Sequence, residues 1–531
     1  MKISLVMLDP ILESGKHAAG GAAYSLAAYF KEKNKFRNDI YYKIFTFNSL
    51  HEGLCEIYTT NILEYKPDIV GFSCYCWNIK IVLACAALIK KISPETLIIL
   101  GGPEVTYDSE ELLSKNKNID VIVRGEGEVT LNELLESYIE NNIFESIEGI
   151  SYRDKDGEVK INPDRDPLVN LDDFPSPFLS GVLKIEGTDG EVFLETVRGC
   201  CFNCSYCLYT KGLKCIQKYS LKRVEDELKY ILTSPYTKSI WFMDPTFNFD
   251  NKRAIEIIKI IKNINPNIPV SFELRADLLS SEFIKALGEI NVSQACMGIQ
   301  SCEDEVNSNV NRKNNIMLIE ENLNLLRKTI EHTCKLFFFD VIYGMPGDNY
   351  LNYKKTIDYA ISKNTYIYYQ PMRVFTGTQL HKESNKYGIV YNDQAPHNTI
   401  VNDTYDLSDM ALSYCLNVGV DFYNYSDYFK EVIQSVRTLL GCEYSDILED
   451  IGRYFWEEDN LNVFRVSNWM PDDRDPNYVL QLFFNYLNYK IESSIPKSKI
   501  NKYLLIESQN IKNKISGFDV NKKASYFSCS I

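Results

Sequence analysis

The sequence of 531 residues predicts an α/β protein with two successive α/β domains and a helical C-terminal region. Apolar runs of strand length alternate with amphipathic segments of helix length over roughly the first 150 residues. The same alternation returns from Glu191 to about residue 400, and from Ser408 onward only helical patterns follow. We therefore expect domains at 1–148, 191–400 and 401–531, joined by a linker at 149–190.

Length and composition limit the classes of protein to which the chain can belong. The chain is longer than a single domain usually is. Lys and Arg total 57 against 72 Asp and Glu, so the net charge of −15 argues against a nucleic-acid partner. No run approaches the roughly 20 apolar residues of a spanning helix, and no signal peptide is evident. The 15 cysteines, an odd number, indicate reduced thiols. We expect a cytoplasmic protein without membrane contact.

Five strand-length runs define the first domain, at 3–8, 41–47, 69–73, 97–100 and 121–123. Their alternation with helices predicts a doubly wound, Rossmann-like parallel sheet, which binds its ligand at the carboxyl ends of its strands. Glycines at such ends let the backbone approach a ligand closely. The candidate binding residues at these ends are Ser73, Tyr75, Trp77, Gly101, Gly102, Pro103, Glu104, Gly125, Glu126, Gly127 and Glu128.

A cysteine-rich loop follows the first strand of the second domain. Cys200, Cys204 and Cys207 form a C-x3-C-x2-C pattern. Three thiolates can hold a 4Fe–4S cluster and leave one iron without a protein ligand. A zinc site or buried structural cysteines are the alternatives, but zinc needs a fourth ligand and no compact Cys/His group follows. Cys201 and Cys215 lie outside the pattern and are expected to be packing or bystander thiols.

This loop resembles the cluster-binding loop of the radical S-adenosylmethionine (SAM) superfamily, in which SAM chelates the open iron. Tyr206 stands where that family carries an aromatic beside the last ligand. The six strand–helix units from Glu191 resemble the partial (βα)6 TIM-type barrel of these enzymes. Ser73 and the pair Gly101-Gly102 match positions of the cobalamin-binding domain. The chain therefore resembles radical SAM enzymes with a cobalamin-binding domain, whose cofactors are a 4Fe–4S cluster, SAM and cobalamin.

The resemblance implies a SAM pocket at the carboxyl ends of the barrel strands. Asp244 and Pro245 follow the second strand, where the family contacts the SAM amino group through backbone carbonyls, and are inferred from this position alone. Glu273 and Arg275 could bind the ribose hydroxyls and the carboxylate of SAM, because a guanidinium pairs with a carboxylate. A structural salt bridge is the alternative for these two. Gln300 is a further candidate, and we expect Gly344 to shape the turn beneath adenine.

His17 could be a ligand of cobalt from below, in the run Gly15-Lys16-His17-Ala18-Ala19-Gly20. Gly15 stands where the orienting Asp of histidine-ligating cobalamin proteins would be. A metal-binding histidine is normally fixed by such a partner. We therefore expect His17 to be a solvated loop residue. In the aromatic-rich last third, patterns predict helices at 410–417, 428–440 and 478–492, with no assigned function.

The resemblance implies reductive cleavage of SAM to a 5′-deoxyadenosyl radical. Methylcobalamin offers a methyl group that a carbon radical can accept, which implies C-methylation of an unactivated carbon of a small molecule or peptide. The electron donor would be a reductase or a flavodoxin-type protein. Radical rearrangement, ring contraction or cyclisation without methyl transfer is the main alternative. A tRNA methylthiotransferase is disfavoured by the acidity of the chain, and a non-enzymatic cobalamin/iron–sulfur sensor is the alternative from another class.

Overall fold

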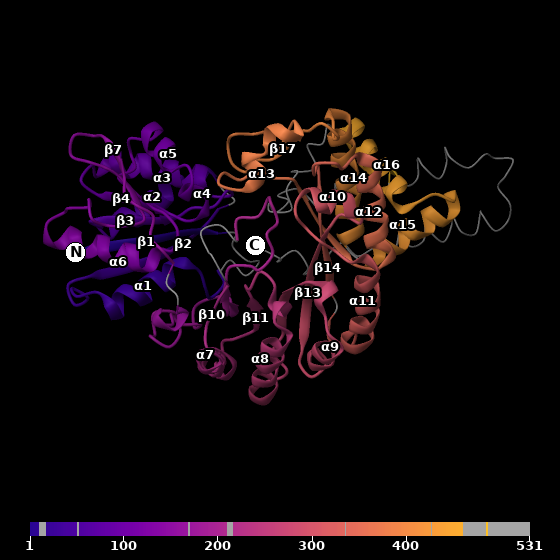
Figure 1. Cartoon of the computed structure of the whole chain (residues 1–531), viewed down its shortest axis with the longest axis horizontal. Coiled ribbons are helices and arrows are strands. Elements are labelled where there is room, and N and C mark those ends of the chain that lie inside the picture. The colour runs from indigo at the N-terminus through magenta and orange to yellow at the C-terminus, as the bar shows by residue number, and fades with distance from the viewer. Residues whose placement is uncertain are drawn as a thin grey trace.

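The computed structural model describes residues 1–9, 17–49, 52–167, 170–209, 216–334, 336–425, 427–459 and 485–486. It confirms the α/β class, with two parallel sheets followed by helices. In Figure 1 the N-terminal sheet is indigo at the left, the barrel is magenta in the centre and the C-terminal helices are orange at the right. Within the described residues, no helix has the length and apolar character needed to cross a membrane.

The N-terminal sheet has seven strands in the order β2-β1-β3-β4-β5-β6-β7. The first five pair in parallel, which is a doubly wound arrangement. The strands are β1 (Lys2–Asp9), β2 (Tyr41–Asn48), β3 (Ile69–Ser73), β4 (Leu97–Gly101), β5 (Val121–Val123), β6 (Ile150–Arg153) and β7 (Val159–Ile161).

Helices cover both faces of this sheet. The helices are α1 (Ala22–Lys33), α2 (Cys55–Glu64), α3 (Ile79–Ile92), α4 (Pro103–Thr106), α5 (Ser109–Lys115) and α6 (Gly127–Glu140). Apolar residues of α1 and α6 form one core with the sheet, whereas those of α2, α3, α4 and α5 form a second core. Burial on both faces explains why the strands are almost continuously apolar.

The segment expected to begin the linker instead extends the N-terminal sheet. Strands β6 and β7 form an antiparallel hairpin, and β6 pairs with the edge strand β5. Asp154 stabilises the hairpin turn, because its carboxylate accepts hydrogen bonds from the backbone N–H groups of Asp156 (3.0 Å) and Glu158 (2.9 Å). The first α/β unit therefore runs on to Ile161, beyond the boundary expected at residue 148.

The barrel sheet has six parallel strands in the order β15-β14-β13-β12-β11-β8. The strands are β8 (Glu191–Leu194), β11 (Ser239–Phe242), β12 (Val270–Leu274), β13 (Val292–Gln300), β14 (Leu336–Tyr343) and β15 (Tyr366–Pro371). The helices between them are α7 (Leu221–Thr233), α8 (Asn251–Ile264), α9 (Ser281–Leu287), α10 (Asp304–Asn309), α11 (Ile316–Ile330) and α12 (Tyr350–Ser362). Six strands leave the barrel open between β15 and β8, as expected for a partial barrel.

The edge strand β8 is covered by the segment that contains His17. Ala19 pairs in parallel with Val192, through hydrogen bonds from Ala19 N to Glu191 O (2.7 Å) and from Phe193 N to Ala19 O (3.0 Å). The carbonyl of His17 also accepts a hydrogen bond from Asp189 N (3.0 Å). The N-terminal domain thus protects an edge that would otherwise present unpaired backbone groups.

Three helices follow the barrel in the chain: α14 (Leu407–Tyr425), α15 (Asp427–Leu440) and α16 (Tyr444–Asp459). Smaller elements precede them, namely β9 (Val197–Arg198), β10 (Gln217–Lys218), α13 (Gln379–Lys382), β16 (Val390–Tyr391) and β17 (Thr399–Val401). Apart from residues 485 and 486, the helix expected at 478–492 lies outside the described residues. The aromatic side chains of Phe422, Phe429 and Phe455 pack in the core rather than lining a site.

Two glycines allow α14 and α16 to touch backbone to backbone. A Cβ atom added to Gly452 would overlap the carbonyl oxygen of Cys415, and one added to Gly419 would overlap that of Leu448. Glycine costs about 1 kcal/mol relative to alanine inside a helix. The close approach of the two helices explains why glycine is nevertheless present at both positions.

Gly452→Ala is expected to destabilise the fold by about 1–3 kcal/mol, because the overlap with a backbone atom outweighs the gain in helix propensity. The free energy of unfolding in urea measures this. Gly53→Ala is the control, since a Cβ atom there has no neighbour within 4 Å among the described residues. Equal stability of the two variants would contradict the packing described.

Candidate active site

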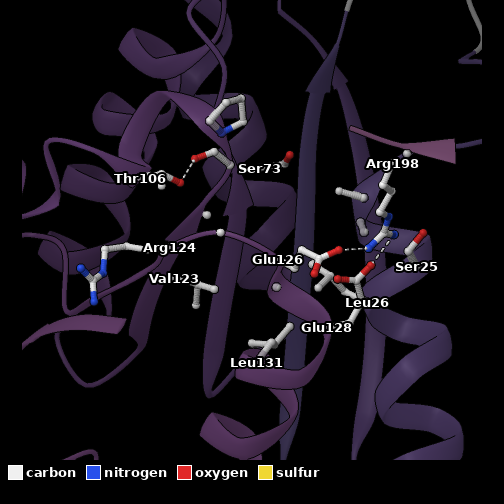
Figure 2. Close-up of a pocket in the computed structure, with 18 of the residues that line it drawn as sticks. Ser25, Leu26, Ser73, Thr106, Val123, Arg124, Glu126, Glu128, Leu131 and Arg198 are labelled. Atoms are coloured by element: carbon white, nitrogen blue, oxygen red, sulfur yellow. Dashed lines mark hydrogen bonds and ion pairs between the residues drawn. The ribbon is translucent and has the colours of Figure 1, made fainter. Parts of the chain in front are cut away.

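A cavity of ≈ 1190 Å³ lies between the N-terminal sheet and the barrel. Its walls come from the carboxyl ends of β3, β4 and β5 on one side and from residues after β8 and β11 on the other. Its volume exceeds the range of about 300–1,000 Å³ that is usual for drug-sized ligands. The expected binding residues that line it are Ser73, Tyr75, Gly101, Gly102, Pro103, Gly125, Glu126, Gly127 and Glu128. Figure 2 shows part of this lining, from Ser73 and Thr106 to Arg198.

Gly102 is a position where only glycine fits. Its φ is 112°, and a Cβ atom would lie 2.5 Å from the carbonyl oxygen of Cys74. Cys74 N also donates a hydrogen bond to Gly101 O at 2.7 Å, which holds the ends of β3 and β4 together. The bare backbone here forms a smooth cavity wall against which a large flat ligand can lie. These features fit a bound corrinoid.

Two expected cobalamin-binding residues do not line this cavity. The ring of Trp77 stacks on Tyr75, with centroids 4.4 Å apart and 6° between the planes, so Trp77 supports the residue that does line it. Glu104 forms an ion pair with His397, with Oε1 and Nε2 2.8 Å apart. Trp77 thus supports a wall residue, and Glu104 ties the N-terminal domain to the segment after the barrel; a direct contact of either with cobalamin stays a prediction. His17 also lies outside the lining.

The contact between Glu104 and His397 should weaken as the pH rises. Burial opposes protonation of His397, but the hydrogen bond and the charge of Glu104 outweigh it and raise its pKa. Because the pKa of His397 is raised in the folded state, its contact with Glu104 contributes its full stabilisation at pH values below the unfolded pKa of about 6.5. This stabilisation is lost as the pH rises through the folded pKa. We expect backbone hydrogen exchange at 102–107 and 395–399, corrected for intrinsic rates, to quicken over that interval. His397→Gln should remove the pH dependence; an unchanged profile in this variant would refute the assignment.

The three cysteines of the pattern lie together at the barrel mouth. Burial, with a smaller contribution from the neighbouring thiols of Cys204 and Cys200, raises the pKa of Cys207 to about 12. Cys204 is 6 % exposed, whereas Cys201 is exposed. Cys215 lies outside the described residues. Among the described residues, no three His, Cys, Asp or Glu side chains are grouped to hold a single metal ion. A four-iron cluster binds each thiolate at a different iron and so accepts a wider spacing.

Asp244 fixes the segment that leads into the cysteine loop. Its carboxylate accepts hydrogen bonds from the N–H groups of Thr196 (2.6 Å) and Val197 (3.0 Å) and from the Thr196 hydroxyl. Burial raises its pKa to about 7 despite these donors. The carboxylate oxygens of Asp244 are thus occupied by the loop, and a contact of its backbone carbonyl with the SAM amino group stays a prediction. Pro245, the next residue, lines the cavity.

Two arginines lie near the cysteines. Arg275 forms a bidentate ion pair with Asp277 (2.9 and 2.6 Å) and stacks on the ring of Phe202 at 4.4 Å. This contact favours the alternative of a structural salt bridge, and a role of Arg275 toward the SAM carboxylate stays a prediction. Arg312 instead lies beside the cluster loop, with Nη1 4.0 Å from the sulfur of Cys204.

Arg312 could not be singled out from the sequence, because it stands in a polar run that lacks any spacing signal. Its guanidinium also donates to the carbonyl of Gly298 and bonds with the hydroxyl of Tyr206. Tyr206 is thereby held beside the cysteines, and its ring packs against a small apolar cluster that includes Val310 and Met345. The loop is anchored further by a hydrogen bond from Ser205 N to Val310 O (2.9 Å).

The remaining expected SAM-binding residues lie at the ends of barrel strands. Burial and the charge of Asp340 raise the pKa of Glu273, and burial raises that of Asp340. Gln300 has a φ of 62° and is 8 % exposed, and its buried Oε1 has no hydrogen-bond partner in the described part of the chain. Such strain is typical of binding positions. These acceptors fit the hydroxyl and amino groups of SAM.

Gly344 forms a turn at the end of β14. Its φ is 77°, and its carbonyl accepts a hydrogen bond from Asn402 Nδ2 at 2.9 Å. The turn is therefore joined to the segment before α14. A role of this turn in placing adenine remains an expectation.

Comparison with known proteins follows the same division of the chain. Residues 194–360 match the model of the radical SAM superfamily, and residues 22–135 match that of the B12 binding domain. A protein named as an uncharacterized methyltransferase from Pyrococcus horikoshii is 30% identical over 317 residues, which is 58% of this chain and 67% of that protein. The cobalamin-dependent radical SAM methyltransferase TokK from Streptomyces tokunonensis is 31% identical over 174 residues, 31% of this chain and 25% of TokK.

A solved structure shows the same arrangement of domains. The cobalamin-dependent SAM radical enzyme OxsB, with aqua-cobalamin and SAM bound, superposes with a TM-score of 0.64 and 16% identity. The superposition covers 98% of this chain and 84% of that one. At this identity the likeness concerns the fold alone. The cysteine loop, the barrel and the N-terminal sheet agree with these matches. The chain therefore belongs to the radical SAM superfamily and carries a B12-binding domain, and its cofactors are a 4Fe–4S cluster, SAM and cobalamin.

Proposed function

We propose that this chain is a cobalamin-dependent radical SAM methyltransferase that methylates an unactivated carbon of a small molecule or a peptide. The cavity shared by the N-terminal sheet and the barrel is the observation that supports this proposal. Its walls combine the strand ends of the N-terminal sheet with residues immediately before and after the cysteine triad, including Gly199 and Leu208. A reaction that needs both cofactors would therefore have one common site.

When bound, the cluster supplies the electron that cleaves SAM, and the corrinoid supplies a methyl group that a carbon radical can accept. The protein residues hold and orient the reactants. Cys200, Cys204 and Cys207 would bind the cluster, and Arg312 beside Cys204 provides positive charge at its edge. The cavity between the domains would shield the reaction from water.

Glu273 and Asp340 would serve as hydrogen-bonding groups of the barrel interior. Burial raises the pKa of both carboxyls, and the charge of Asp340 raises that of Glu273 further. A buried carboxyl that keeps its proton can donate a hydrogen bond as well as accept one. Such a pair suits the ribose hydroxyls of SAM, or a polar group of the substrate above it.

The names of both curated relatives support methyl transfer, and the cobalamin dependence in the name of TokK supports the route. The match spans only a quarter of TokK, so the substrate of that enzyme carries no weight here. The negative net charge of −15 favours a small molecule or peptide over a nucleic acid. A one-electron donor, such as a reductase or a flavodoxin-type protein, must supply the reducing equivalents.

Product analysis tests this proposal. The chain is reconstituted without oxygen with iron, sulfide and hydroxocobalamin, and is then incubated with titanium(III) citrate and excess SAM. We expect both S-adenosylhomocysteine and 5′-deoxyadenosine by mass spectrometry. Formation of 5′-deoxyadenosine without S-adenosylhomocysteine would overturn methyl transfer and favour rearrangement or cyclisation. Absence of both from a fully loaded protein would favour a sensor.

A further inference from the structure

One arginine joins the wall of the cavity to the cluster loop. Arg198 lies two residues before Cys200, and three carboxylates bind its guanidinium. Nη1 lies 3.0 Å from Glu126, Nη2 lies 2.7 Å from Glu128, and Nε lies 3.0 Å from Glu195. Figure 2 shows Arg198 reaching toward Glu126 and Glu128. We call Arg198 and its three carboxylates the Arg198 junction.

The Arg198 junction crosses the boundary between the two domains. Glu126 and Glu128 lie at the start of α6, in the N-terminal domain, whereas Glu195 and Arg198 follow β8 of the barrel. All four side chains line the cavity. The side chain of Arg198 is 14% exposed and that of Glu128 is 7% exposed. Breaking so well-shielded a pair costs far more than breaking a surface ion pair, because it leaves buried charges uncompensated.

The backbone around Arg198 is fixed on its other side as well. Asp244 at the end of β11 holds the N–H groups of Thr196 and Val197. The ring of Phe174, from the connecting segment, lies 4.7 Å from the guanidinium carbon of Arg198. The strand that leads into Cys200 is therefore held by the barrel through Asp244 and by the N-terminal domain through Arg198. A shift of residues 125–128 would therefore reach this strand through Arg198.

We propose that Arg198 is a positioning residue that couples corrinoid binding to the cluster loop. A corrinoid against residues 125–128 fixes Glu126 and Glu128, which fix Arg198 and the strand before Cys200. A bound cluster fixes the same strand from the other end and preorganises the cavity wall. Thermodynamic linkage then requires each cofactor to raise the affinity for the other by the same factor. This inference rests on the two cofactors of the proposed function and is independent of methyl transfer.

The affinity for hydroxocobalamin, with and without the cluster, tests the proposal. Titration under anaerobic conditions, followed by absorbance, gives a dissociation constant for the cluster-loaded and the cluster-free chain. We expect the cluster to tighten binding by about tenfold in the native chain. Arg198→Lys retains the charge, but a single ammonium cannot bind three carboxylates in this geometry. We expect its ratio of the two constants to fall within about twofold of unity.

The effect of the corrinoid on retention of the cluster gives a second measurement. Hydroxocobalamin should slow the removal of iron by the chelator bathophenanthroline in the native chain, and this protection should be lost in Arg198→Lys. Arg223→Lys is the matched control. Arg223 lines the same cavity, but its ion pair with Glu227 (2.9 Å) lies within α7 and does not cross to the N-terminal domain. We expect this control to keep the native ratio of affinities, whatever its absolute affinity.

Three outcomes would overturn the proposal. The corrinoid affinity of the native chain could be the same with and without the cluster. Arg198→Lys could keep the native ratio of the two dissociation constants, or the Arg223→Lys control could lose that ratio equally. If Arg198→Lys takes up no cluster, Glu128→Gln tests the junction from the other domain and should also lose the ratio. Coupling without S-adenosylhomocysteine formation would refute methyl transfer alone. Formation of S-adenosylhomocysteine without coupling would refute the role of Arg198 alone.

Discussion

Cys204→Ala is expected to abolish 5′-deoxyadenosine formation and to keep corrinoid binding at the affinity of the cluster-free native chain, about tenfold weaker than with the cluster. Cys204 is the most buried of the three cysteines of the pattern, and Arg312 lies against its sulfur. Two thiolates cannot retain a four-iron cluster in the geometry that presents an open iron to SAM. The corrinoid cavity is built from other elements. Iron content, hydroxocobalamin absorbance and nucleoside analysis measure the three properties in one preparation.

Cys201→Ala is the matched control for this experiment. Cys201 neighbours the triad but is exposed and lies outside the spacing pattern. It should retain iron and SAM cleavage at native levels. Cleavage that survives Cys204→Ala would refute the assignment of the triad. Corrinoid binding weaker than that of the cluster-free native chain would show that the substitution disrupts the fold rather than the cluster alone.

Gly102→Ala should weaken hydroxocobalamin binding by at least about tenfold while the cluster is retained. The added Cβ atom would lie 2.5 Å from the carbonyl oxygen and 3.0 Å from the nitrogen of Cys74. Overpacking of this kind costs roughly 1–3 kcal/mol, and the positive φ of 112° adds strain for any residue with a Cβ atom. The backbone must shift at the wall that the corrinoid faces. Titration by absorbance measures the affinity.

Gly157→Ala separates backbone strain from the clash. Gly157 has a φ of 85°, but its Cβ atom would meet nothing within 4 Å among the described residues. It lies in the turn between β6 and β7 and is not among the residues that line the cavity. We expect this variant to lose some stability and to bind hydroxocobalamin with native affinity. Native affinity in Gly102→Ala would contradict the placement of the corrinoid at this wall.

Much of the fold could be predicted because it depends on local patterns. The apolar run at 193–197 predicts the first barrel strand, but β8 is Glu191–Leu194, and the N–H groups of Thr196 and Val197 donate to the carboxylate of Asp244 instead. The sequence Asp-Lys-Asp-Gly at 154–157 predicts a hairpin turn. Nothing in that turn specifies which sheet the hairpin joins, and so its pairing with β5 was not foreseen.

The candidate site could be predicted where spacing alone defines the chemistry. The C-x3-C-x2-C pattern is local, and the glycines of the cavity wall follow directly from the strand ends. The partner of a charged side chain is set by tertiary structure instead. Glu104 pairs with His397 from a segment almost 300 residues away, and Arg312 reaches Cys204. Neither of these pairs leaves a periodic signal in the sequence.

We expect one cavity to bring the corrinoid close to the cluster. Dipolar coupling between cobalt(II) of the bound corrinoid and the reduced cluster, measured by pulsed electron paramagnetic resonance, tests it most directly. We predict a resolved coupling in the reconstituted native chain and an uncoupled cobalt signal in Cys204→Ala. A native chain that binds both cofactors without measurable coupling between them would contradict the shared cavity.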